Sequence, residues 1–360
     1  MFGKVKRKIA GKISNIIRSA VRSEIENVLP IIPQLIEFQN SAKEDRQSFY
    51  DHTKDPLGHI NFYEGLKDRL LSAGVSVEPV DIDIPDFEQW LNDFPEIRKH
   101  YENMKDVLIE KCLEHYLTFK HLNISDGDIY IDVASAGSPW AEVLNSRIEI
   151  RDQRSEIRDQ RSEIRDQRSE IRDQRSEIRD QRSEIRKRRQ DSIRAYRLDL
   201  SFPKGINGID IGADAGDTKL PDDFASVLSL QCAYECFMGD ADIRFIEEAS
   251  RILDKKGRYG IAPLYLADIH FVSTSPYCNQ SEVKIEPAAK KVWRDDEYKV
   301  PFSRHYSPES FAERIYSWIP DGMEGKVFYF KNLEEVMRHY PGQKIYCFFM
   351  FVCEKKKDTQ

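Results

Sequence analysis

Three aspartates stand at or just beyond the ends of short apolar segments, and their carboxylates could hold a nucleoside. They are Asp132, Asp199 and Asp214. A carboxylate in the position of Asp199 can accept hydrogen bonds from both ribose hydroxyls. Asp214 is followed by the small Ala215, so it could accept the amino group of a purine while a backbone amide pairs with a ring nitrogen. Taken singly, Asp199 could instead cap a helix and Asp214 a turn.

The residues that follow Asp132 are small and would let the backbone approach a ligand closely. They are Ala134, Ser135, Ala136, Gly137 and Ser138. Ser138 can cap the next helix and Pro139 suits its first position. The free amides at such a helix start face the carboxyl edge of a parallel sheet, where ligands bind. Small residues at a tight turn can also serve packing alone.

The elements that must position these residues alternate between strands and helices. The expected strands are 129–133, 196–200, 208–213, 225–230 and 258–264, with a helix over 241–253 and another that starts at Ser307. A strand, a short helix and a strand (326–330 and 344–353) close the chain as an edge addition. This alternation predicts an α/β fold with a parallel sheet covered by helices on both faces.

A repeat separates the first two strands. Residues Asp152–Arg186 are five identical copies of DQRSEIR. The sequence distance from Asp132 to Asp199 is 67 residues, and it falls to 25 when residues 147–188 are removed, close to the ~20 expected for a first strand and its ribose-binding acid. With Ile157 at heptad position a, two parallel copies would pair Glu at g with Arg at e, which predicts a coiled-coil homodimer. The favoured alternative is a solvated, partly helical excursion.

The amino-terminal segment is basic and amphipathic. Residues 1–23 carry a charge of +7 and no acid, so the remainder carries −14. Apolar residues recur at helical spacing, namely Phe2, Val5, Ile9, Ile13, Ile16 and Ala20. We expect a helix whose residues 2–22 contact an anionic membrane surface, the alternatives being a helix packed on its own domain or a targeting leader.

The composition excludes several classes of function. An acidic body argues against nucleic acid as the main partner. The longest apolar run, Ile345–Cys353, has nine residues and is too short to span a membrane. The six cysteines lack metal-binding spacing, so we expect no metal site and reduced thiols in a cytoplasmic protein.

Taken together, the aspartates and loops resemble the motifs of class I S-adenosylmethionine-dependent methyltransferases, of the branch that acts mostly on small molecules. The resemblance covers residues 126–266 and the tail after Ser307. The matching motifs are the acid and small-residue loop (132–138), the ribose-binding acid (Asp199), the adenine-contacting pair (Asp214 and Ala215, ahead of Leu220 and Pro221), a phenylalanine before a strand (224–230) and the turn 251–257. The sequence departs from the family at two loop glycines, here Ala134 and Ala136, and at an acid, here Ala225.

The resemblance implies a Rossmann-like, mainly parallel sheet of seven strands with S-adenosyl-L-methionine across its carboxyl edge. The implied cofactor-binding residues are Asp132, Ala134, Ser135, Gly137, Asp199, Asp214, Ala215 and Gln231. The implied domains are an amino-terminal helix (1–40), a helical cap region (41–125), a methyltransferase domain (126–146 and 189–356) and a projecting helical repeat insert (147–188).

The implied activity is methyl transfer to a small-molecule or lipid- or glycan-linked acceptor, at oxygen. The signature of amino-group methylases is absent, because its place reads Gln231-Cys-Ala-Tyr234. Its absence disfavours methylation of DNA bases and glutamine, and leaves carbon or another nitrogen of a small molecule as alternatives to oxygen. An oxygen acceptor requires a base, and the sequence does not choose among Tyr234, Glu235, His270 and His305. Two other hypotheses stay open: a non-catalytic interaction protein with a membrane helix and a coiled coil, and a nicotinamide-dependent oxidoreductase, disfavoured because GxGxxG is missing.

Overall fold

The computed structural model describes residue 22 and the ranges 29–47, 56–146, 193–279, 283–294 and 299–356. The repeat insert predicted over residues 147–188 lies outside this part of the chain, as does the amphipathic helix predicted over residues 2–22 apart from Arg22. The predicted membrane contact and the predicted coiled-coil homodimer therefore stay predictions. No helix in the described ranges is long and apolar enough to cross a membrane.

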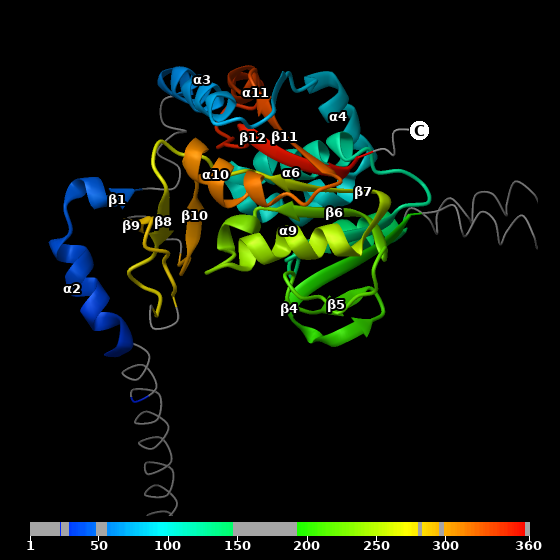
Figure 1. The fold of residues 1–360 in the computed structure, drawn as a ribbon. Coiled ribbons are helices and arrows are strands. Elements are labelled where there is room, and N and C mark those ends of the chain that lie inside the picture. The colour runs from blue at the N-terminus through cyan, green and yellow to red at the C-terminus, as the bar shows by residue number, and fades with distance from the viewer. Residues whose placement is uncertain are drawn as a thin grey trace, which may run out of the picture.

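Eight strands form the main sheet, in the order β2-β11-β12-β7-β6-β3-β4-β5 (Figure 1). Five strands form one half of this sheet: β3 (Ile129–Val133), β4 (Arg194–Asn207), β5 (Asp210–Gly212), β6 (Ala225–Gln231) and β7 (Leu253–Ala262). They pair in parallel, with β4 and β5 on one side of β3 and β6 and β7 on the other. This is the strand order of doubly wound sheets, in which ligands bind where the order reverses.

The carboxyl-terminal tail completes the other half of the sheet. It consists of β11 (Met323–Phe330), α11 (Leu333–His339) and β12 (Phe349–Lys355), with β12 antiparallel to both β11 and β7. The edge addition and the Rossmann-like fold class are therefore confirmed. The sheet has eight strands rather than seven, because β2 (Val77–Val80) pairs with the outer side of β11. Pro79 is tolerated in β2 because an edge strand leaves one row of amides unpaired.

Neighbouring residues of β7 show that helices cover both faces of the sheet. The ring of Tyr259 packs 5.5 Å from that of Phe245 in α9 (Ala241–Ile252). A Cβ on Gly260 would instead lie 3.1 Å from the side chain of Leu122, which caps α6 (Leu108–His121). Because consecutive strand residues point to opposite faces, α9 and α6 lie on opposite sides of the sheet.

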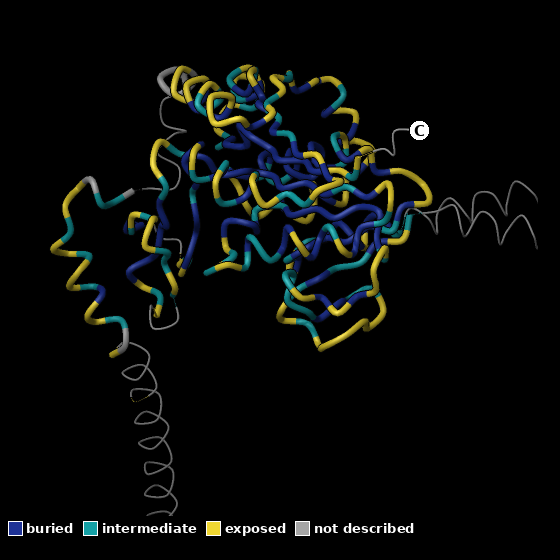
Figure 2. Tube along the Cα trace, in the orientation of Figure 1, coloured by how far each residue is buried: buried dark blue, intermediate teal, exposed yellow. Residues whose placement is uncertain are grey.

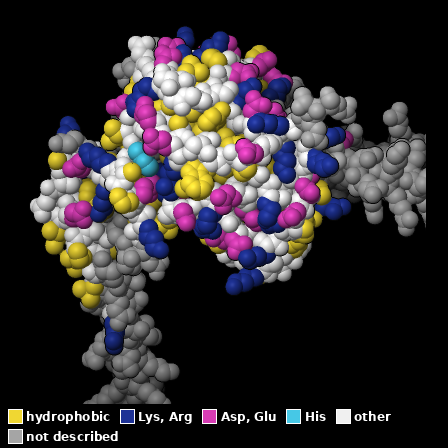
Figure 3. Space-filling model, viewed as in Figure 1, with side chains coloured by type: hydrophobic (Ala, Val, Ile, Leu, Met, Phe, Trp, Pro, Cys, Tyr) yellow, Lys and Arg dark blue, Asp and Glu magenta, His cyan; other side chains and the backbone are white. Residues whose placement is uncertain are grey.

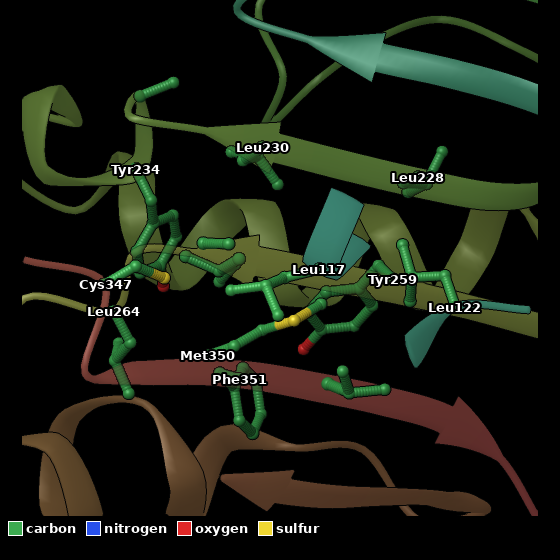
Figure 4. Packing of buried hydrophobic residues seen from close by; sticks show 14 of the residues in the cluster. Leu117, Leu122, Leu228, Leu230, Tyr234, Tyr259, Leu264, Cys347, Met350 and Phe351 are labelled. Carbon is green, nitrogen blue, oxygen red and sulfur yellow. The ribbon is translucent and has the colours of Figure 1, made fainter. Parts of the chain in front are cut away.

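Further helices complete these layers. They are α3 (Pro56–Ser72), α4 (Ile84–Asp93), α5 (Pro95–His100) and α10 (Pro308–Arg314), with 3₁₀ turns η4 (Glu102–Val107), η5 (Tyr234–Cys236) and η6 (Tyr316–Trp318). The central strands β3, β6, β7 and β12 are buried along most of their length (Figure 2). Figure 4 shows part of this core, to which α6 contributes Leu117 and the strands contribute Leu228 and Phe351. Ser307 caps α10 as predicted, accepting a hydrogen bond from the amide of Ser310 at 3.1 Å.

A second, four-stranded sheet lies beside the main one (Figure 1). Its strands are β1 (Arg46–Gln47), β9 (Lys290–Arg294), β8 (Phe271–Thr274) and β10 (Ser303–His305), and α2 (Ile32–Asn40), with η1 (Leu29–Ile31) before it and η2 (Lys43–Asp45) after it, adjoins this sheet. The fully buried Arg304 of β10 joins the two sheets. Its guanidinium lies 2.8 Å from Asp242 at the start of α9 and 2.7 Å from Glu286. The buried guanidinium of Arg304 is thus paired with two carboxylates, which offsets the cost of burying its charge.

The two segments that flank the insert are hydrogen-bonded to each other inside the domain. Residues 140–146 are helical, and Asn145 exchanges two hydrogen bonds with the backbone of Ala195 in β4, at 2.7 and 3.0 Å. The β3–β4 pairing continues from there to Val133 and Leu198. The positions at which the insert leaves and rejoins the domain are therefore fixed independently of the repeats.

Deleting Asp152–Arg186, which removes all five heptads, should leave the domain folded. The free energy of unfolding is expected to change by less than about 1 kcal/mol, because loop-closure entropy varies slowly with loop length. Urea unfolding followed by circular dichroism measures this change. A variant that fails to fold would show that the repeats stabilise the domain.

Candidate functional site

The loop after β3 is built around the buried carboxyl group of Asp132. Its Oδ2 atom accepts a hydrogen bond from the hydroxyl of Ser138, and that hydroxyl accepts one from the amide of Trp140 at 3.3 Å. Burial raises the pKa of Asp132 to about 7, although the Ser138 hydroxyl and the Arg197 charge act in the opposite direction. Asp132 therefore lies beneath the loop and holds the start of the next helix in place.

Backbone geometry explains why glycine is usual in this loop. Ala134 has φ of +55°, a left-handed conformation that costs a residue with a Cβ about 1 kcal/mol. The next residue, Ser135, is buried, its amide donates to the carbonyl of Leu198 at 3.2 Å, and its hydroxyl has no hydrogen-bond partner among the described residues. The backbone at position 134 thus has a conformation that glycine adopts without strain, but the residue there carries a methyl group.

Asp199 meets this loop directly. Its Oδ2 atom accepts a hydrogen bond from the amide of Ala136 at 3.2 Å, and its Oδ1 atom accepts one from the amide of Ser201 at 2.8 Å. The carboxylate is thus fixed directly after the part of β4 that pairs with β3, and lone pairs are still available. The loop residues 134–137 and Asp199, 62 or more positions apart in sequence, form one structural unit.

Asp214 and Ala215 follow β5 at the same edge. Asp199 pairs in register with Gly212, two residues before Asp214. The Asp214 carboxylate accepts a hydrogen bond from the amide of Gly216 at 2.8 Å and from the guanidinium of Arg244 at 3.0 Å. Gly212 is required at this position because a Cβ there would lie 2.0 Å from the carbonyl oxygen of Pro203. Asp214 is therefore half-buried and oriented by an ion pair.

Gln231 ends β6 on the other side of β3. Its amide group donates to the hydroxyl of Thr118 in α6 at 3.0 Å and to that of Ser229 at 2.7 Å. Its carbonyl oxygen is buried and has no partner within the described part of the chain. The next residue, Cys232, has φ of +50°, so the backbone turns sharply where β6 leaves the sheet.

Beyond Gln231 lies a cluster of polar side chains that we call the acceptor-side cluster: Lys111, Glu114, Cys232, Glu235 and Tyr265. Lys111 and Glu114 form an ion pair of 2.8 Å within α6. The Cys232 thiol lies 3.3 Å from the Tyr265 hydroxyl and donates to Oε1 of Glu235 at 3.5 Å. The other oxygen of Glu235 is buried and has no partner among the residues described.

Burial dominates the electrostatics of this cluster. It raises the pKa of Glu114 to about 7, against the opposing charge of Lys111, and it also raises the pKa of Glu235. The pKa of the Cys232 thiol rises to about 12 for the same reason. A carboxyl group with a raised pKa and an unpaired oxygen, as in Glu235, is suited to exchange a proton with a bound molecule.

The structure separates the four side chains considered as a base. Tyr234 is buried in the core and donates to the carbonyl of Asp242 at 3.0 Å. His270 lies 3.0 Å from Glu286 in the second sheet, and His305 is stacked on Phe271 with ring centroids 4.4 Å apart. Two of the four reach the acceptor-side cluster: Glu235 through the Cys232 thiol, and His305 through the ring of Tyr265, with ring centroids 5.2 Å apart. Of these two, Glu235 offers a buried carboxylate oxygen that has no partner among the described residues.

The carboxyl edge therefore brings the predicted residues together in two groups. Asp132, Ala134, Ser135, Gly137, Asp199, Asp214 and Ala215 lie at the ends of β3, β4 and β5, and Gln231 lies at the end of β6. Sequence reasoning missed Lys111, Glu114 and Tyr265. The available signal was the spacing of Lys111 and Glu114, which lie three residues apart in a predicted helix and carry opposite charges. In the described ranges, no three His, Cys, Asp or Glu side chains could hold a metal ion.

Comparison with known proteins finds similarity in solved structures. No protein-family model and no curated protein matches the sequence. The 1,6-didemethyltoxoflavin-N1-methyltransferase of Burkholderia thailandensis, solved with 1,6-didemethyltoxoflavin and S-adenosylhomocysteine, is similar at 9% identity over 76% of this chain and 87% of that one, with a TM-score of 0.37. A putative S-adenosylmethionine-dependent methyltransferase from Listeria monocytogenes is similar at 10% identity over 69% and 99%, with a TM-score of 0.37. A possible histamine N-methyltransferase from Thermotoga maritima is similar at 13% identity over 75% and 98%, with a TM-score of 0.30.

The raised pKa of Asp132 predicts a specific pH dependence of stability. Because the folded protein binds this proton more tightly than the unfolded chain, its stability should fall as the pH rises from about 4 to about 7. Asp132→Asn should remove that contribution, which is worth roughly 1.4 kcal/mol for each unit of pKa shift. Urea unfolding of both proteins at the two pH values tests this, and equal losses of stability would contradict it.

Proposed function

We propose that the protein transfers a methyl group from S-adenosyl-L-methionine to an oxygen atom of a small-molecule or lipid- or glycan-linked acceptor. The observation that carries this proposal is the hydrogen bond from the Ala136 amide to Asp199. This hydrogen bond joins the small-residue loop after β3 to Asp199, the acid proposed to bind ribose, although the repeat insert separates them in sequence. Both lie beside β3, where the strand order of the sheet reverses and where ligands bind in such folds.

The side chains at this edge fit an adenosyl group. Asp199 is anchored by two amides and keeps lone pairs for ribose hydroxyls. Asp214 and Ala215 follow the next strand, β5, which pairs with β4 so that Asp199 lies opposite Gly212. Ser135 and Gln231 each hold a buried oxygen without a partner in the described chain, and these oxygens support binding of the polar methionyl part. The methyl group of Ala134 narrows the space for that part.

Asp199→Ala should weaken binding of S-adenosylmethionine at least tenfold. The substitution removes acceptors for two hydroxyl groups, and a hydrogen bond to a charged group is worth about 1.5–3 kcal/mol. Calorimetric titration measures the affinity. Asp93→Ala, which alters an exposed aspartate of α4, is the matched control and should bind normally. Unchanged affinity in Asp199→Ala, or tight binding of NAD with no binding of the methyl donor, would contradict the proposed site.

The acceptor-side cluster supports transfer to oxygen. When bound, the cofactor supplies a methyl group on a positively charged sulfur. The chain must align the acceptor with that group and remove the proton of a hydroxyl acceptor as its oxygen gains the methyl group. Glu235 offers an unpaired, buried oxygen and a raised pKa for this purpose. We assign it as the general base, with the proton passing from the acceptor hydroxyl to the carboxylate.

Glu235→Gln should lower methyl transfer by roughly 10²–10⁴-fold, the usual contribution of a general base. Its affinity for the methyl donor should stay unchanged, which separates this result from failure of the donor site. Incubation with labelled donor and cell extract, followed by identification of the labelled product, measures transfer. Glu247→Gln, an exposed position on α9, is the control.

The pH profile adds a second readout. Because the pKa of Glu235 is raised, transfer by the parent protein should increase with pH through a value above the ordinary one for glutamate. Full activity in Glu235→Gln would exclude the assigned base. Donor binding without transfer to any component of the extract would instead favour the non-catalytic interaction protein.

A further inference from the structure

The helix α2 lies against the second sheet and leaves several of its apolar side chains exposed. Its inward face holds the buried Gln34 and the half-buried Leu35 and Phe38. Gln34 is buried against the second sheet's loop, where its amide donates to the carbonyl of Pro276 at 3.1 Å. Next to it, Glu37 pairs with Lys291 of β9 at 2.9 Å. These contacts fix the rotation of the helix about its axis.

An aromatic contact holds the same orientation. The ring of Phe38 meets that of Trp293 in β9 edge-on, with centroids 6.2 Å apart. The guanidinium of Arg46 lies 4.5 Å from the centre of the Phe38 ring and also donates to the Phe38 carbonyl at 2.6 Å. The carboxyl end of α2 is therefore attached to the second sheet on this face alone.

Three apolar side chains lie on the outward face of this segment. Leu29, Ile32 and Ile36 are 57%, 41% and 53% exposed. Their spacing of three and four residues places them on one side of a helix. Figure 3 shows hydrophobic side chains gathered along the outer flank of the segment labelled α2 in Figure 1. We call these three residues the α2 stripe.

The charge of the adjoining sequence indicates what covers the α2 stripe. Residues 1–23 are separated from Leu29 by five residues, which include Glu24 and Glu26. They contain seven Lys and Arg residues and no acid, whereas the rest of the chain has a net charge of −14. Apolar side chains beside clustered basic residues are the combination that binds anionic lipid, by burial of the first and Coulomb attraction of the second. An anionic surface would repel the acidic remainder of the molecule.

We propose that the α2 stripe docks on an anionic lipid surface. A second copy of the chain would bring another segment of the same positive charge to the interface, whereas anionic lipid brings the opposite charge. The docking is independent of methyl transfer, because none of its residues belongs to the carboxyl-edge site.

Vesicle co-sedimentation of the full chain tests the proposal. The protein should bind vesicles of phosphatidylserine and phosphatidylcholine, should bind vesicles of phosphatidylcholine alone much more weakly, and should be released from the first by salt. Ile36→Asp should weaken binding to the anionic vesicles roughly tenfold or more, because burial of one isoleucine side chain is worth at least about that factor.

Ile206→Asp is the matched control. Ile206 lies on β4 and is 50% exposed, close to the 53% of Ile36, and its substitution should leave vesicle binding unchanged. Thermal unfolding of both variants verifies that they are folded. Equal binding by Ile36→Asp and Ile206→Asp, or equal binding to both kinds of vesicle, would overturn the proposal. A dimer that Ile36→Asp converts to a monomer, with no vesicle binding, would assign the stripe to a second copy instead.

Discussion

The position of β3 between β4 and β6 is the constraint on which the rest of the structure depends. The chain leaves β3, passes through the insert and returns to pair in parallel with it as β4, then crosses to its other side as β6. The connections that lead from β3 to β4 and onward to β6 therefore run to opposite sides of β3. This reversal leaves a crevice at the carboxyl edge of the sheet. The Ala136–Asp199 contact and the Asn145–Ala195 hydrogen bonds both follow from this register, since they join segments that meet only when the two strands are aligned.

The buried charge of Arg304 holds the second sheet against the helices that cover the main sheet. Arg304 joins the second sheet to α9 through Asp242, and it also donates to the carbonyl of Phe237, the residue after η5. The turn that carries Glu235 is thus supported from the second sheet. Breaking such a pair would leave an unpaired charge in the interior, which costs far more than a surface ion pair. The position of Glu235 consequently depends on contacts that lie outside the main sheet.

The proposed lipid surface and the proposed acceptor side are linked through the same second sheet. The helix α2 packs on Trp293 of β9, and β10 contacts the turn after β6 through Arg304. The positive charge of residues 1–23 would attract an anionic membrane surface, whereas the acidic remainder of the chain would be repelled by it. One end of the molecule would therefore face the membrane.

The sequence by itself determined the alternation of strands and helices, the extent of β3, the Ser307 cap and the three aspartates at strand ends, because strand burial, capping and turn chemistry are local in sequence. Once the repeats were removed, it also predicted that Asp199 lies near the loop after β3, and the two are joined by a hydrogen bond. Only the tertiary structure decided that Glu235 and His305, rather than Tyr234 or His270, reach the acceptor-side cluster. It likewise decided that Val77–Val80 adds an eighth strand and that α2 buries Gln34 while Ile32 and Ile36 stay exposed. Each of these depends on contacts between distant segments, such as Cys232 with Tyr265, which no local pattern encodes.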